Sequence, residues 1–348
     1  MTDLRFSSIT RRNFMAASAA AGFSALAAPA NALRAIPRVG LIGCGAGGAA
    51  LALARDTADL DLAAVCDVSQ AAATRMAGCT GARIAPHWQA LVERRDLGAI
   101  LIATPDHSHA EIALAALAAG KHVFMLPPVA STAAGAQSLA EMAGRSGRVL
   151  HVAGCPEFDA LWRDARSALE SRRGPLRRIH VECAALPVEA PGHWARQRAA
   201  SLGPAARQVV AMLYPLQYHL ELGAPRQMTA LAGIFDAVPR ETADAVTLTA
   251  HYASDVTAVI TCAPGIMVQR PVILRGAWPA IELARPRALV ADSGPGRELS
   301  TFARAIRGED PPEGMAARLE AACTVQAALC SALDAACGLA APVTAQAG

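Results

Sequence analysis

Aromatic and charged residues are scarce in this chain. Of its 348 residues, 4% are aromatic and 18% are charged, and the formal net charge is only +3. Nucleic-acid-binding surfaces are usually strongly basic, often with aromatic residues between the basic ones. The arginine pairs at 172–173 and 177–178 flank a Gly-Pro turn and have no aromatic residue between them. We therefore expect no nucleic-acid partner.

Cysteine is present but lacks the spacing that binds metals. None of the nine cysteines forms a C-x-x-C pair, so no zinc site is expected. Cys323, Cys330 and Cys337 recur every seven residues in an Ala/Leu-rich helical stretch. Free cysteine behaves as a small buried hydrophobe, which favours packing there. Disulfide formation is the alternative in an oxidising compartment, but the odd number of cysteines indicates no particular pairing.

Lysine is almost absent. Lys121 is the only lysine in the chain, and it lies at an expected helix-to-strand turn. A long basic side chain at such a turn usually keeps its charge in water, so a solvated structural role is expected. The sequence offers no other ammonium group for catalysis.

The first 32 residues are predicted to be a twin-arginine signal peptide. Residues 10–15 contain the arginine pair, residues 15–28 are weakly apolar, and Ala30-Asn31-Ala32 fits a cleavage site. The apolar stretch is too short to span a bilayer stably, so we expect no stable membrane span. These features predict a periplasmic protein exported by the twin-arginine route. The alternative is a disordered arm with a chance arginine pair.

The rest of the chain shows two patterns of apolar residues. From residue 38 to about 153, short strands alternate with helices, which predicts a Rossmann-type, doubly wound parallel sheet in an α/β fold. Beyond residue 175, longer strand-like runs predict a C-terminal α+β domain with an open antiparallel sheet. The strands are expected at 39–42, 62–66, 99–103, 122–125 and 149–153, and then at 179–184, 228–233, 245–252, 257–262, 272–274 and 288–291.

These patterns define the expected domains. A dinucleotide-binding domain is predicted at 33–153, and a substrate or oligomerisation domain at 154–312. A C-terminal helix at 313–343 is predicted to pack back on the first domain. An uncovered apolar sheet face rarely meets water alone, so we expect a homo-oligomer or a partner subunit on the open sheet.

The first expected strand runs into a glycine-rich turn. Gly43, Gly45 and Gly48 form G-x-G-x-x-G, which lets backbone approach a pyrophosphate at the helix N-terminus near Ala46. Asp67 follows the second strand, where an acid binds the ribose hydroxyls and disfavours a 2′-phosphate. NAD is therefore the predicted cofactor, with NADP less favoured. A turn that merely needs flexible residues is the alternative.

Residues 99–124 carry a more specific pattern. The third of the predicted strands leads into Thr104-Pro105, then His109, and one helix later Gly-Lys-His-Val. This order resembles the Gfo/Idh/MocA oxidoreductases, as do the glycine-rich turn and residues 299–343. The resemblance implies an NAD(P)-dependent oxidoreductase that acts on a carbohydrate or polyol-like substrate. It also implies that Thr104, Pro105 and His107 lie near the cofactor.

The chain departs from this family where protons are handled. In place of the family's E-K-P triplet it has Leu126, Pro127 and Pro128, so the catalytic lysine is absent. A second motif, D-x-x-x-Y, keeps Tyr214 but has Val210 instead of the aspartate. Loss of a positioned acid or base typically lowers a rate by about 10²- to 10⁴-fold. The sequence therefore predicts a slow oxidoreductase or none.

Four side chains remain as candidates around the substrate. Tyr214 is predicted to be the acid/base, and His109 is predicted to position the substrate, with a structural histidine as its alternative. His193 and Trp194 precede the loop expected over the substrate, and such a pair suits a sugar; a packed loop anchor is equally consistent.

Two functions remain open. The first is a periplasmic oxidoreductase with tightly retained NAD(H), because an exported protein would carry its cofactor along. The second is a catalytically inactive nucleotide- or sugar-binding or partner subunit. A lyase or epimerase would need a base that the sequence does not offer.

Overall fold

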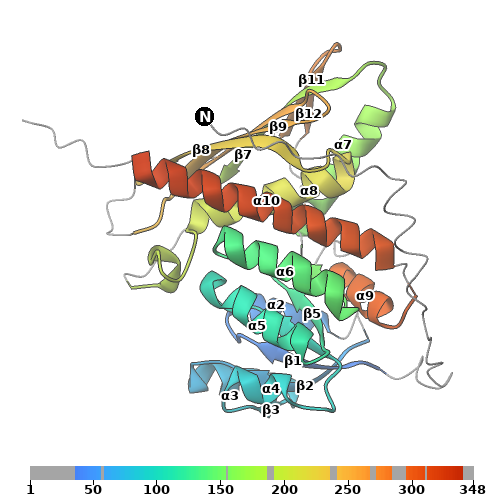
Figure 1. The fold of residues 1–348 in the computed structure, drawn as a ribbon, viewed down its shortest axis with the longest axis vertical. Coiled ribbons are helices and arrows are strands. Elements are labelled where there is room, and N and C mark those ends of the chain that lie inside the picture. Colours follow the sequence, from blue (N-terminus) through green and yellow to red (C-terminus); the bar gives the residue numbers. More distant parts are fainter. Residues whose placement is uncertain are drawn as a thin grey trace, which may run out of the picture. The chain divides into compact units, whose positions relative to one another are not determined.

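The computed structural model describes residues 36–55, 59–153, 156–185, 192–235, 241–266, 272–283, 295–309 and 312–339. The predicted signal peptide, the strand predicted at 288–291 and Cys155 lie outside these ranges. The described residues form one compact unit, which contains two six-stranded sheets (Figure 1).

The first sheet is parallel throughout and has the strand order β3-β2-β1-β4-β5-β6. Its strands are β1 Arg38–Ile42, β2 Asp61–Cys66, β3 Arg83–Ile84, β4 Ala99–Ile102, β5 His122–Met125 and β6 Leu150–Val152. The five strands expected from the sequence are confirmed. Only β3 was not anticipated, because two exposed residues give no hydrophobic pattern. The inner strands are buried on both faces, which explains their continuous apolar sequences.

Helices cover both faces of this sheet, and side-chain caps set where some begin. Ser69 accepts a hydrogen bond from the backbone N–H of Ala72, and Thr132 accepts one from Gly135. The helices of the chain are α2 Ala46–Ala54, α3 Gln70–Thr80, α4 Trp88–Val92, α5 Asp106–Ala118, α6 Ala133–Ser146, α7 Pro156–Glu170, α8 Pro204–Leu220, α9 Pro295–Ile306 and α10 Pro312–Leu339, with a 3₁₀ turn, η3, at Trp194–Arg196.

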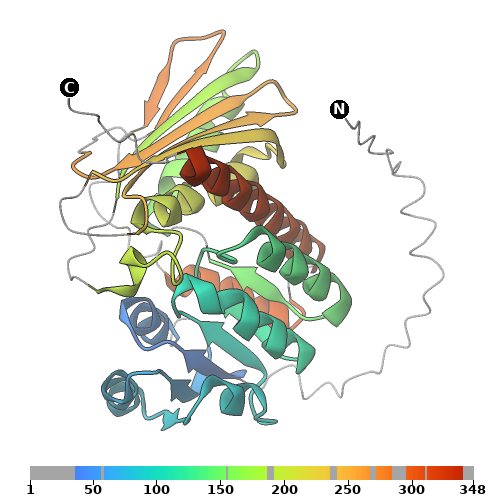
Figure 2. The same cartoon turned by 60° about the vertical axis from the view of Figure 1, so that its left-hand side comes forward.

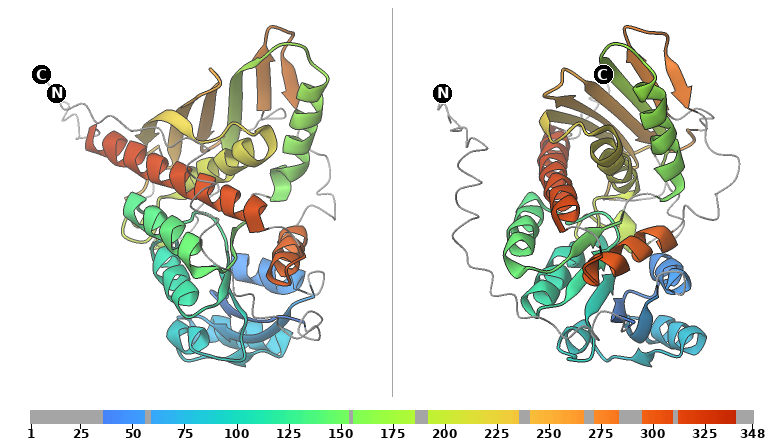
Figure 3. Two further views of the ribbon diagram at one scale, coloured as in Figure 1. Left: turned by 45° about the vertical axis from the view of Figure 1, so that its right-hand side comes forward. Right: turned by 90° about the vertical axis from the view of Figure 1, so that its right-hand side faces the viewer.

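Helix α9 returns from the C-terminal part of the chain to cover the first sheet. It lies beside α2 (Figure 3). The ring of its fully buried Phe302 packs edge-on against Phe124 of β5, with ring centroids 5.6 Å apart. The ring of His151, on β6, stacks on Phe124 with centroids 5.0 Å apart. Aromatic pairs of this geometry stabilise beyond the area that they bury. The first sheet is thus completed by residues distant in sequence.

The second sheet corrects one prediction. Its order is β12-β11-β7-β10-β9-β8, and β7 pairs with β10 in parallel, so the sheet is mixed rather than antiparallel. Alternating apolar residues reveal which face of a strand is buried, but not the direction of its neighbour. The strands are β7 Leu176–Ala184, β8 Pro225–Gly233, β9 Ala245–Tyr252, β10 Thr257–Ala263, β11 Val272–Gly276 and β12 Ile281–Leu283.

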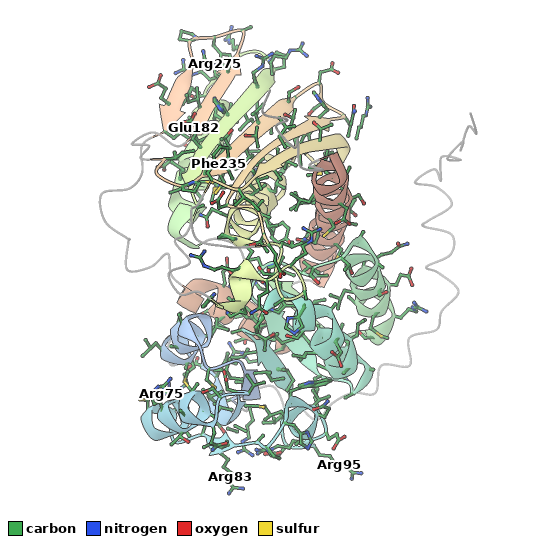
Figure 4. The ribbon with its side chains drawn as sticks, turned by 90° about the vertical axis from the view of Figure 1, so that its left-hand side faces the viewer. Arg75, Arg83, Arg95, Glu182, Phe235 and Arg275 are labelled. Carbon is green, nitrogen blue, oxygen red and sulfur yellow. The ribbon has the colours of Figure 1, made fainter. Side chains whose placement is uncertain are left out.

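One face of the second sheet is covered by helices and the other is open (Figure 2). Helix α8 packs against β7, β9 and β10, while α10 contacts β8 together with α6 and β6 of the first sheet. On the open face lie Glu182 and Arg275, and Phe235 follows the end of β8 (Figure 4). Leu231, Ile234 and Phe235 are exposed by 74%, 54% and 77%.

The described residues show neither a membrane span nor a metal cluster. No helix among them combines the length and apolar character needed to cross a bilayer. Within the same ranges, His, Cys, Asp and Glu nowhere gather in groups of three that could hold a metal ion. The seven cysteines described there are free thiols, among them Cys183 and Cys262, which face each other across β7 and β10.

His122 makes stability depend on pH. Its Nδ1 accepts a hydrogen bond from the backbone N–H of Val149 at 3.0 Å, which requires that this nitrogen carry no proton. Burial, assisted by the positive charge of Arg148, lowers the pKa of His122 from 6.5 to about 4. Between these values the unfolded chain binds the extra proton and the folded one does not, so acidification favours unfolding.

We expect acidification from pH 7 to pH 4 to remove up to about 3 kcal/mol of unfolding free energy through His122. His122→Gln, which keeps an acceptor but does not titrate, should lose less stability over this interval in urea titrations. His251→Gln, at an exposed position, is the control and should behave like the unsubstituted chain. Equal pH dependence in His122→Gln would contradict this explanation.

Candidate functional site

The glycine-rich turn connects the end of β1 to the start of α2. Gly43 has a φ of +95°, which glycine adopts readily, and its N–H donates to the carbonyl of Cys66 at 2.9 Å. A Cβ on Gly43 would lie 2.5 Å from the carbonyl oxygen of Ala103, and one on Gly48 would lie 1.9 Å from that of Gly43. These two glycines are required by the packing of the fold itself.

Gly45 is different. A Cβ there would meet nothing within 4 Å, and its φ of −73° is accessible to any residue. Gly45 caps α2, whose first residue is Ala46, so the unpaired N–H groups of the first helical turn lie beside this open space. The space over Gly45 is therefore where an anionic group can approach the backbone.

Asp67 lies at the end of β2, beside the turn. Its carboxylate accepts hydrogen bonds from the backbone N–H of Cys44 at 2.6 Å and of Ser69 at 2.7 Å. It therefore holds the glycine-rich turn against the second strand. The same half-buried carboxylate is the acid predicted to bind the ribose, and Val68, which is fully exposed, follows it.

Thr104, Pro105 and His107 lie where β4 ends and α5 begins. The Thr104 hydroxyl accepts from Ser108 at 2.8 Å, and Pro105 is the N-cap of α5. His107 is exposed, and both its backbone N–H and its ring Nδ1 lie 3.3 Å from the carbonyl oxygen of Ala200. Because Gly43 contacts Ala103 and Thr104, this segment adjoins the glycine-rich turn.

His109 is buried, with 1% of its surface exposed. Its ring nitrogens lie 2.7 Å from the carbonyl oxygen of Pro128 and 2.8 Å from that of Thr104. Burial lowers the pKa of His109, against the raising effect of the hydrogen bonds to these carbonyls and of Asp106. These contacts are structural, and they disfavour the substrate-positioning role predicted for this histidine.

Of the residues in place of the E-K-P triplet, Pro128 is buried, whereas Leu126 and Pro127 are half-buried. Leu126 lies against α2, where a Cβ on Gly47 would be 2.6 Å from its side chain. Pro127 occupies the position expected for the lysine, and the bond from Pro127 to Pro128 is cis. Lys121 cannot substitute: it is buried and donates to the carbonyls of Arg94 and Leu97, and burial lowers its pKa. The expected solvated role of Lys121 was wrong.

Tyr214 is also buried, with none of its surface exposed. Its hydroxyl donates to Gln326 of α10 at 3.0 Å and accepts from the backbone N–H of Val129 at 3.4 Å. Val210, one helical turn earlier, is equally buried. The tyrosine therefore connects α8, α10 and the segment after β5, a position that disfavours its predicted role as acid/base.

His193 and Trp194 lie at the start of η3. Their rings are tilted against each other with centroids 5.4 Å apart, and the exposed His193 ring caps the turn by accepting from Ala195 N–H. The guanidinium carbon of Arg207, on α8, lies 4.7 Å from the centre of the Trp194 ring. Cation–π contact of this kind orients both side chains.

Asp106 is the group that sequence reasoning missed. This fully buried carboxylate begins α5 and accepts hydrogen bonds from the hydroxyl of Ser201 at 2.8 Å and the N–H of Leu202 at 3.1 Å. Its other oxygen lies 3.2 Å from Nε of Arg207, an ion pair without hydrogen-bond alignment. An acid placed directly after Thr104-Pro105 was the one available signal.

A family comparison agrees with this geometry. Residues 37–154 match the family model described as "Oxidoreductase family, NAD-binding Rossmann fold". A curated relative, inositol 2-dehydrogenase of Pseudomonas fluorescens, is 36% identical over 113 residues, which cover 32% of this chain and 34% of the relative. The first relatives found are matched over only 34% to 41% of their own length.

Solved structures share the fold over more of the chain. GenD2 from gentamicin A biosynthesis, solved in complex with NAD, has a TM-score of 0.72 at 20% identity and covers 86% of this chain and 95% of its own. Biliverdin reductase from Synechocystis, solved with biliverdin and NADP+, has a TM-score of 0.68 at 21% identity, covering 86% and 99%. At such identities the likeness concerns the fold alone.

The glycines provide a test that separates folding from cofactor binding. Gly45→Ala should leave the free energy of unfolding within about 1 kcal/mol of the original, because its Cβ meets nothing. It should nevertheless weaken NAD binding about tenfold or more, because the methyl group enters the space over the helix N-terminus. Gly48→Ala should instead destabilise the fold by about 1–3 kcal/mol.

Gly78→Ala is the matched control, because Gly78 lies on α3 with open space around it. It should retain full NAD affinity by calorimetry. Unchanged NAD binding in Gly45→Ala would contradict the assignment of this turn as the pyrophosphate site.

Proposed function

We propose that this chain is an oxidoreductase of the Gfo/Idh/MocA type with tightly retained NAD, because residues 37–154 match the NAD-binding Rossmann fold of that oxidoreductase family. The observation that carries the proposal is the open space over Gly45, at the N-terminus of α2 and beside Asp67. The bound nicotinamide would accept or donate the hydride. NADP is less favoured, because the Asp67 carboxylate repels a 2′-phosphate.

The proposed substrate is a carbohydrate or polyol. The inositol dehydrogenase similarity supports this class, although it covers a third of that relative's length. The partly exposed pair of His193 and Trp194 offers a ring surface with a polar edge, which suits a hydroxylated ring. His107, exposed beside the end of β4, is an accessible imidazole that would exchange a proton with the substrate.

We also propose that the protein acts in the periplasm. The arginine pair, apolar stretch and cleavage site at the N-terminus support export in the folded state. A cofactor acquired before export would have to remain bound through many turnovers. Tight retention of NAD is therefore what periplasmic oxidoreductase activity would require.

A non-catalytic binding subunit is the second candidate. It is favoured by the absence of the lysine, by apolar Val210, and by the burial of Tyr214 and His109. Such a protein would keep the nucleotide site and bind a sugar or a partner protein. Hydride transfer from an alcohol needs a proton to move in step, so these losses bear directly on turnover.

The two candidates differ in what bound cofactor does. We expect the exported protein, purified without added nucleotide, to show the absorbance and fluorescence of bound nicotinamide. Under the first proposal, a sugar or polyol in a panel that includes inositol changes its redox state. Cofactor that is inert to every compound supports the binding subunit, and protein without affinity for NAD contradicts both.

Tyr214→Phe sharpens this experiment. If Tyr214 transfers protons, loss of its hydroxyl should lower turnover by about 10²- to 10⁴-fold. From its buried contacts we expect unchanged turnover and a loss of about 1 kcal/mol of unfolding free energy, because Gln326 and Val129 lose a partner.

We further propose that a second copy of this chain or a partner subunit covers the open face of the second sheet. Leu231 on the open face, with Ile234 and Phe235 beyond the end of β8, forms an exposed apolar surface. We expect light scattering to give a mass of at least two chains and Leu231→Glu to reduce it. Leu53→Glu, at an exposed position on α2, is the control. A mass of one chain for the purified protein would contradict self-association.

A further inference from the structure

Arg207 is held from two sides beside the proposed active site. Asp106 lies 3.2 Å from its Nε, and the Trp194 ring lies 4.7 Å from its guanidinium carbon. The arginine side chain keeps 34% of its surface exposed, whereas Asp106 is completely buried. The Arg207 side chain is therefore oriented by the protein while about a third of its surface faces solvent.

The pairing with Asp106 involves only the Nε of Arg207. Asp106 accepts hydrogen bonds from Ser201 and Leu202 on its other oxygen, so this carboxylate has no further oxygen to offer the arginine. In the part of the chain that the structure describes, no residue is hydrogen-bonded to the terminal nitrogens of Arg207. In arginine side chains generally, this edge of the guanidinium binds a carboxylate or a phosphate through two parallel hydrogen bonds.

The position of Arg207 relates it to the cofactor. Asp106 follows Thr104-Pro105 at the carboxyl end of β4, and a Cβ on Gly43 would lie 2.9 Å from the N–H nitrogen of Thr104. The glycine-rich turn, the end of β4 and the Asp106–Arg207 pair thus occupy one edge of the first sheet. Ligands of open α/β sheets bind at this edge.

We propose that Arg207 binds an anionic group of the substrate, so that the protein acts on an acidic sugar bearing a carboxylate or a phosphate. This inference rests on the proposed function and narrows its substrate class. With Pro127 in place of the lysine, Arg207 is a fixed cation beside this site that Asp106 and Trp194 already orient. An anionic group paired with Arg207 would fix one end of the sugar, and a hydroxyl-bearing carbon elsewhere on the sugar would reach the nicotinamide.

The test compares sugars that differ only in charge. Calorimetry on NAD-loaded protein would use glucose with glucuronate, galactose with galacturonate, and glucose 6-phosphate. We expect at least one acidic compound to bind about tenfold tighter than its neutral partner. The carboxylate and phosphate arms identify which anion is preferred. Equal affinities in every pair would overturn the inference.

Variants assign the preference to the arginine. Arg207→Met removes the charge but keeps most of the aliphatic stem, and the preference should disappear. Arg207→Lys keeps a charge beside buried Asp106, so it should fold even where the methionine variant does not, with a weaker preference for acids. Arg145→Met, which removes an exposed arginine of α6, is the control and should behave like the original protein. A preference that survives in Arg207→Met would also overturn the inference.

A titration with NAD, together with the sugar titrations repeated in the absence of NAD, separates this inference from the proposed function. NAD binding without any preference for acidic sugars refutes the role of Arg207 and leaves the oxidoreductase proposal intact. A preference for acidic sugars in protein that does not bind NAD refutes the oxidoreductase proposal and supports the anion site.

Discussion

The close approach of the glycine-rich turn to β4 is the constraint on which the rest of the site depends. A Cβ on Gly43 would collide with the backbone of Ala103, and one on Gly48 would collide with that of Gly43. This contact brings the ends of β1 and β4 and the start of α2 to one edge. Because the pyrophosphate end of the nucleotide site is built from backbone, it can persist although the lysine of the E-K-P triplet and the aspartate of the D-x-x-x-Y motif are absent.

Apolar residues stand at these two positions, and Tyr214, which the chain retains, lies in the interior. Leu126 packs against α2, Val210 is buried, and Tyr214 is bonded to Gln326. The substitutions are therefore mutually consistent: the apolar positions pack, and the remaining hydroxyl has polar partners. Cofactor binding and proton transfer depend on different residues in this fold, so the first can be kept while the second is reduced.

Hydrophobic patterning predicted most of the architecture, because buried strands and glycine turns leave local signals. It revealed the strands of the first sheet except β3, and the positions of β7 to β11. It could not reveal that β7 and β10 are parallel, because direction depends on the connections between strands. The partnership of Asp106 with Arg207 joins residues distant in the sequence, and the burial of Lys121 depends on carbonyls from another segment. No local pattern encodes such contacts.

Helix α10 restricts how the protein can admit a ligand. It packs against α6 and β6 of the first sheet and against α8 and β8 of the second, and its Gln326 bonds to Tyr214. A hinge motion that separated the two sheets would have to break these buried contacts together. Entry and release are therefore expected through local rearrangement of shorter segments, such as the η3 loop, rather than through swinging of whole domains.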